Sequence, residues 1–164
     1  MLNKETLNEL NEYVQGYLLE EFIIHEEPLL LESAHYSIDE ELTAFIEINR
    51  KESLQEVLFT YIERSGLTDP EVYNKAGMDR RLFSKIRSNA EYRPKKTTII
   101  SLALALELTK EETNHLLSSA GYFLSDSDTW DLVIQFCLEK KINNLHDVNE
   151  ALDYFQLKPI MGVK

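Results

Sequence analysis

Basic side chains that could bind phosphate gather in one short stretch of an otherwise acidic chain. The formal net charge is −12, yet residues 75–96 contain eight basic and two acidic side chains. Residues 1–60, by contrast, contain fourteen acidic and three basic side chains. Because the screening length at physiological salt is about 8 Å, the basic stretch can act largely independently of distant acidic regions. The uneven distribution of charge is therefore compatible with binding of a polyanion, despite the negative net charge.

The basic stretch includes a predicted helix from Arg80 to Ser88, with Asp79 suited to cap its first turn. Placing residues about 100° apart around this helix brings Leu82, Phe83 and Ile86 together on the side expected to face the core. The opposite side collects hydrogen-bond donors without an acidic interruption: Arg80, Arg81, Ser84, Lys85, Arg87 and Ser88. Such a surface suits phosphate oxygens and guanine edges, although a solvated helix face has the same composition.

A second short helix is predicted directly before this one. Either Thr68 or Asp69 can cap it, Pro70 lies in its first turn, and it runs to Ala76. Gly77 then makes a tight turn into the basic helix. Two short helices joined by a glycine-containing turn form a helix-turn-helix, whose second helix can lie in the major groove of DNA.

These elements belong to a predicted all-α chain with few glycines and prolines. We expect an acidic helical segment over residues 1–52, a helix-turn-helix domain over 53–124, and a C-terminal helical extension over 125–164 that packs on the core. Capping-box spacings and glycines divide the middle domain into five helices, near 53–65, 69–76, 80–88, 97–108 and 109–120.

The flanking segments are predicted from apolar periodicity. An amphipathic helix runs from Leu7 to about Phe22, and a short one starts at the capping residue Ser37. Two further helices cover about 128–140 and 145–155. Their aromatic side chains, Trp130, Phe136 and Tyr154, are expected to pack in the core rather than to form a base-stacking platform.

Several classes of function lack the residues that they need. Cys137 is the only cysteine, and the four histidines are scattered, so we predict no metal site and no disulfide. The paired glutamates come without a phosphate-binding loop or a nucleophile motif, so we predict neither an enzyme nor a cofactor. An apolar run of membrane-spanning length is missing, and no secretory leader is seen, so a cytoplasmic location is expected.

The run from Asp69 to Leu117 resembles the Cro/repressor-like, or XRE-type, helix-turn-helix domain of bacterial and phage regulators, with the match covering about residues 53–117. Ala76-Gly77-Met78 looks like the family's turn, and the apolar positions after Pro94 look like its fourth helix. The resemblance implies base contacts by early residues of the basic helix, here Arg80, Arg81, Ser84 and Lys85. It also implies contacts to backbone phosphates by Arg93, Lys95 and Lys96.

Two hypotheses follow. The first is a bacterial or phage-type transcriptional regulator that binds double-stranded DNA and uses its outer helices to form a homodimer or to receive a signal. The second is a protein-protein interaction module with the same fold, whose basic face and N-terminal helices dock on another protein. Asp69 and Tyr73 favour the second, because the family commonly has a glutamine and a small alanine at these positions.

Overall fold

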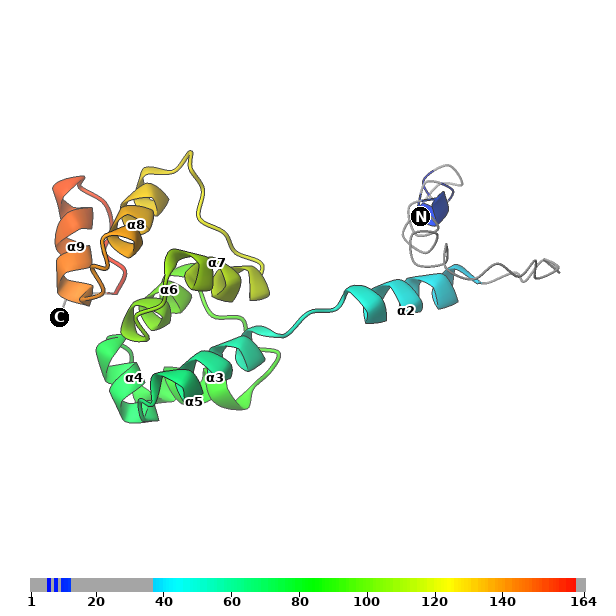
Figure 1. The fold of residues 1–164 in the computed structure, drawn as a ribbon, viewed down its shortest axis with the longest axis horizontal. Helices are drawn as coiled ribbons and strands as arrows, with labels where there is room; N and C mark the ends of the chain where they lie inside the picture. Colours follow the sequence, from blue (N-terminus) through cyan, green and yellow to red (C-terminus); the bar gives the residue numbers. More distant parts are fainter. Residues whose placement is uncertain (1–5, 7, 9, 13–36, 162–164) are drawn as a thin grey trace. The chain divides into compact units, whose positions relative to one another are not determined.

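The computed structural model describes residues 6, 8, 10–12 and 37–161, and every regular element among them is a helix. The chain divides into two compact units, residues 1–50 and 51–164. The first unit contains α2 (Ile38–Asn49). The second contains seven helices (Figure 1): α3 (Leu54–Ser65), α4 (Asp69–Lys75), α5 (Arg80–Ser88), α6 (Lys96–Ala105), α7 (Lys110–Ser119), α8 (Thr129–Glu139) and α9 (Leu145–Tyr154). The all-α prediction is confirmed for these residues.

The second unit is built around α6, which is buried on every side. All of its residues from Thr98 to Ala105 are buried, and α4, α7 and α9 pack against it. A helix that is apolar all round can be stable in water only when neighbours cover its whole circumference. The small side chains of Ala103 and Ala105 are among these buried residues. The extension after residue 125 therefore belongs to the same compact unit as the helices before it.

Capping residues set most of the helix boundaries. Ser53 with Glu56 and Thr109 with Glu112 form the two predicted capping boxes. Asp79 accepts a hydrogen bond from Leu82 N at 2.7 Å and so caps α5 as predicted. The predicted helix 97–108 is instead α6, which starts one residue earlier and ends at Ala105. Leu106 and Leu108 leave the helix but remain buried, so their apolar character alone had extended the prediction too far.

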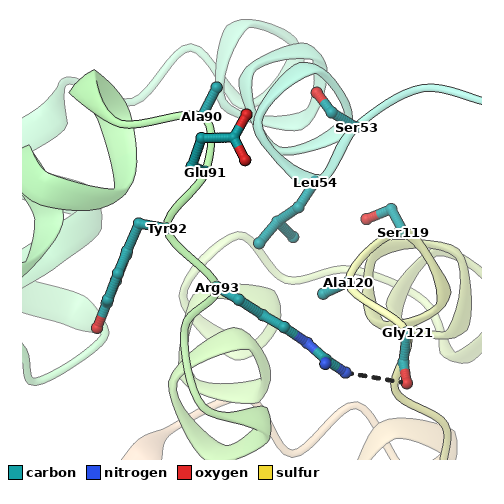
Figure 2. A pocket seen from close by; sticks show the side chains of 9 residues that line it. All are labelled: Ser53, Leu54, Ala90, Glu91, Tyr92, Arg93, Ser119, Ala120 and Gly121. Atoms are coloured by element: carbon teal, nitrogen blue, oxygen red, sulfur yellow. Dashed lines mark hydrogen bonds between the residues drawn. The ribbon is translucent and has the colours of Figure 1, made fainter.

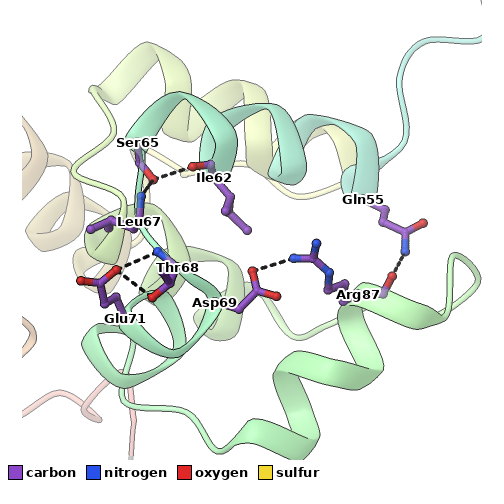
Figure 3. A network of polar contacts seen from close by, with 8 residues as sticks. All are labelled: Gln55, Ile62, Ser65, Leu67, Thr68, Asp69, Glu71 and Arg87. Carbon is purple, nitrogen blue, oxygen red and sulfur yellow. Dashed lines mark hydrogen bonds and ion pairs between the residues drawn. The ribbon is translucent and has the colours of Figure 1, made fainter.

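Thr68, rather than Asp69, is the cap of α4. Its backbone N–H and its hydroxyl both donate to Glu71 Oε2 at 2.7 Å, as Figure 3 shows. These hydrogen bonds favour the charged carboxylate and lower the pKa of Glu71 below its ordinary value. The side chain of Asp69, the first residue of α4, is therefore left to interact with another helix.

The predicted aromatic core of the C-terminal helices is wrong for two of its three residues. Trp130 is half-buried, and its indole N–H donates to the carbonyl of Lys158 at 2.9 Å. Phe136 and Tyr154, however, are 54% and 83% exposed. The inward faces of α8 and α9 are already filled by aliphatic side chains such as Ile134, Val148 and Leu152. The aromatic rings therefore lie on the outer faces.

Helix α2 of the first unit has a capped start but no buried residue. Ser37 caps α2 by accepting a hydrogen bond from Glu40 N at 3.3 Å, as predicted, but the return hydrogen bond expected from the Glu40 side chain is not formed. No residue of α2 is buried, and its apolar side chains Leu42 and Ile46 are 45% and 44% exposed. Most of the helix predicted from Leu7 to Phe22 lies outside the described residues. None of the described helices combines the length and apolar character needed to cross a membrane.

The turn between α4 and α5 requires glycine for two separate reasons. Gly77 has a φ of +65°, in the left-handed region that residues with a Cβ adopt at a cost. A Cβ at this position would also lie only 2.8 Å from Leu145 Cδ2 of α9. Leu145 at the start of α9 thus lies against the turn that sets the direction of α5.

We predict that Gly77→Ala destabilises the protein more than Gly66→Ala does. Both glycines have a positive φ, and forcing alanine into that region costs about 1–2 kcal/mol. An added Cβ would meet nothing within 4 Å at Gly66, whereas at Gly77 it would clash with Leu145. Urea unfolding of the two variants and the parent measures this difference; equal losses of stability would contradict the role assigned to Leu145.

Candidate nucleic-acid interface

The basic helix α5 is held by its apolar side. Phe83 and Ile86 are each 3% exposed, and Leu82 is half-buried, so the predicted inward face is confirmed. The ring of Phe83 also contacts Tyr73 of α4, with ring centroids 5.7 Å apart at an angle of 54°. Tyr73 thus packs in the joint between α4 and α5. This contact fixes the two short helices to each other.

The opposite side of α5 displays free donors. Arg80, Arg81, Ser84 and Lys85 are all exposed. Among the described residues, the guanidinium groups of Arg80 and Arg81 have no ion-pair partner and no hydrogen-bond partner. The ammonium of Lys85 lies 4.2 Å from the centre of the Tyr92 ring. This aromatic contact orients the lysine without neutralising its charge.

Arg87 lies on the same helix but is tied to its neighbours. Its Nη1 atom lies 2.6 Å from Asp69 Oδ1, and its guanidinium lies 4.9 Å from the centre of the Phe59 ring. The side chain of Gln55 donates to the carbonyl of Arg87, as Figure 3 shows. These contacts link the last turn of α5 to α3 and α4. They also compensate the charge of Asp69, which the sequence alone would leave facing a phosphate.

Arg93 follows α5 and borders a small pocket of about 310 Å³ between the start of α3 and the end of α7 (Figure 2). Its guanidinium lies 4.4 Å from the centre of the Tyr122 ring, and Nη2 donates to the carbonyl of Gly121 at 3.3 Å. Glu91 lines the same pocket, so the charges there are mixed. Arg93 is nevertheless exposed, and its charge remains available at the surface.

Lys95 and Lys96 are neighbours in sequence with different surroundings. Lys95 is exposed, whereas Lys96 Nζ lies 2.7 Å and 2.6 Å from the two carboxylate oxygens of Asp131 in α8. Asp131 is 4% exposed and also accepts a hydrogen bond from Ser125 N at 2.8 Å. Lys96 therefore neutralises a buried carboxylate and joins the start of α6 to α8.

The eight predicted site residues thus fall into two groups. Arg80, Arg81, Ser84, Lys85 and Lys95 present exposed donors that no carboxylate neutralises among the described residues. Arg87 and Lys96 form ion pairs, and Arg93 is partly held by a carbonyl. Sequence reasoning missed every partner of the second group. The contact of Lys85 with Tyr92 is the one that the sequence could have indicated, because this tyrosine lies only seven residues after the lysine, among basic residues.

The described residues contain no group of three or more histidine, cysteine, aspartate or glutamate side chains arranged to hold a metal ion. Cys137 is buried, and burial raises the pKa of its thiol. Comparison of the chain with family models, curated proteins and solved structures found no match. Any functional assignment therefore depends on the residues of the chain itself.

We predict that Lys96→Met destabilises the protein by about 3 kcal/mol, because the substitution leaves the buried carboxylate of Asp131 without its cation. Lys95→Met is the matched control: it removes the same charge from an exposed neighbour and should change stability little. Chemical denaturation of both variants at neutral pH gives the comparison. If the two variants unfolded at the same denaturant concentration, Lys96 would not have the structural role described.

Proposed function

We propose that the chain is a helix-turn-helix protein of the Cro/repressor-like type that binds double-stranded DNA and acts as a transcriptional regulator. α4 and α5 form the motif, and α5 is its recognition helix. The observation that carries the proposal is the outer side of α5, where Arg80, Arg81, Ser84 and Lys85 are exposed together on a helix anchored by Phe83 and Ile86. Such a helix offers donors to base edges and phosphates.

The basic side chains have different roles in this proposal, depending on whether they form an ion pair within the protein. Arg80 and Arg81 open α5, and the N-terminal residues of a recognition helix are those that reach base edges. Lys85, Arg93 and Lys95 suit phosphate contacts, because their charges remain available at the surface. Arg87 and Lys96 contribute mainly by holding α5 and α6 in place.

A protein-protein interaction module is the second candidate. The net charge of −12 favours it, because the field of the whole chain repels a polyanion at long range. The ion pairs of Arg87 and Lys96 favour it as well, since they lower the number of cations available to phosphate.

We predict that the full chain binds random-sequence duplex DNA at low salt and that Arg81→Glu with Lys85→Glu abolishes this binding. Fluorescence anisotropy of a labelled duplex measures the affinity. If five cations contact phosphate, the logarithm of the affinity should fall by about 4.5 for each tenfold rise in salt. Contacts made by Arg80 and Arg81 to bases instead of phosphates would lower that slope.

The control for this experiment is Lys51→Glu with Lys158→Glu, which changes the net charge equally at two exposed positions outside α5. This variant should retain most of the affinity, because the local surface rather than total charge makes the contacts. Absence of binding by the parent chain at about 50 mM salt, where phosphate contacts are strong, would favour the interaction module. Equal loss of binding in both double variants would show that α5 is not the binding surface.

A further inference from the structure

A pocket of about 310 Å³ lies beside the turn between α4 and α5. It is lined by the last residue of α4, by residues at the end of α6 and by residues around the start of α9. One of these, Leu145, is the residue whose Cδ2 would lie 2.8 Å from a Cβ at Gly77. Ligand sites in proteins commonly have volumes of about 300–1,000 Å³, so this pocket is large enough only for a small molecule.

Two opposite charges line the pocket, and neither contributes much to the stability of the fold. Lys75 Nζ lies 3.8 Å from Glu107 Oε1, which is too far for a hydrogen bond. The two side chains are 50% and 66% exposed, and an ion pair between exposed groups has little effect on stability. The ammonium is therefore available to a ligand carboxylate, and the carboxylate is available to a ligand ammonium.

Two asparagine side chains in the same pocket have unused hydrogen-bonding groups. Asn143 is half-buried, and its amide has no hydrogen-bond partner among the described residues. Asn144 Oδ1 accepts hydrogen bonds from His146 N at 2.8 Å and from Asp147 N at 3.4 Å, which leaves the amide nitrogen as a donor. Water or a polar ligand can satisfy such groups, so the pocket suits a ligand with charged or polar ends.

The backbone at Glu107 is strained in a way that the fold does not require. Its φ is +54°, in the left-handed region that glycine adopts more easily than other residues. Glu107 lies two residues after the end of α6, and the corresponding positions after α4 and α7 are Gly77 and Gly121. Strained residues of this kind are often found at binding sites. A glycine at this position would relieve the strain but would remove the carboxylate from the pocket.

The rest of the pocket lining is apolar. Leu104 and Ala105 are buried, and Leu145 is half-buried. An anion alone would meet the carboxylate of Glu107, and a cation alone would meet the ammonium of Lys75. A ligand that carries both charges and a short apolar side chain matches all of these groups.

We propose that this pocket binds a free aliphatic α-amino acid. Its carboxylate binds Lys75, its ammonium binds Glu107, and its side chain packs against Leu104, Ala105 and Leu145. The site is separate from the outer side of α5, and its occupation does not depend on DNA binding.

The test is a titration of the isotope-labelled full chain with L-leucine at neutral pH and without DNA, followed by the chemical shifts of the backbone amides. Binding should be saturable, with a dissociation constant of about 1 mM or lower. The signals of Lys75, Gly77 and Glu107 should shift. Isocaproate lacks the ammonium and isoamylamine lacks the carboxylate, so each should bind at least about tenfold more weakly than L-leucine. Free glycine, which has no apolar side chain, should also bind more weakly.

Glu107→Gly separates binding from folding. The variant should be at least as stable as the parent in urea, because glycine adopts the left-handed conformation more easily. It should nevertheless raise the dissociation constant of L-leucine at least about tenfold, since the ammonium loses its carboxylate. Gln156→Gly is the matched control, because Gln156 has a φ of +57° but lies outside the pocket. This control should leave the dissociation constant unchanged.

Three results would overturn the proposal. One is a parent chain that shows no saturable binding of L-leucine. Another is equal weakening of binding by Glu107→Gly and Gln156→Gly, which would assign the effect to the backbone and not to the carboxylate. The third is binding of isocaproate, isoamylamine or free glycine as tightly as L-leucine, which would show that one of the assigned contacts is not made.

Discussion

Burial of α6 on all of its sides is the constraint from which the rest of the second unit follows. This helix has no polar face to turn toward water, and α4, α7 and α9 cover it. The polar group at its first residue, Lys96, meets the same constraint by pairing with Asp131. The C-terminal helices are therefore needed to complete the core, and Leu145 at the start of α9 lies against Gly77 in the turn before α5.

The position of α5 is a consequence of this packing. Only its Phe83 and Ile86 side is buried, while Arg87 joins its last turn to Asp69 of α4 and to Phe59 of α3. A rigid helix with an uninterrupted row of outward donors loses little conformational freedom when it binds a surface. The proposed DNA contacts thus depend on residues that do not themselves touch the ligand.

Sequence and structure differ most in what the basic side chains do. Eight basic residues between 75 and 96 look equivalent when they are counted. In the folded chain, Arg87 and Lys96 neutralise carboxylates that lie 18 and 35 residues away, and Lys85 lies against an aromatic ring. Long-range ion pairs of this kind have no local sequence signal, because the partner is brought close only by tertiary packing. For Asp69, the sequence alone predicted repulsion of a phosphate, whereas in the structure its carboxylate forms an ion pair with Arg87.

The sequence by itself determined the helical class, the two capping boxes, the cap of α5 at Asp79 and the inward side of that helix. All of these depend on interactions within three or four residues, which a linear pattern records. Tertiary structure alone decided which lysine is free and which is buried against Asp131. It also decided that Phe136 and Tyr154 face outward, because aliphatic residues on the other side of each helix had already filled the core. Apolar periodicity shows that a helix has an apolar face. When a helix has apolar residues on two sides, only the packing of the folded chain decides which side is buried.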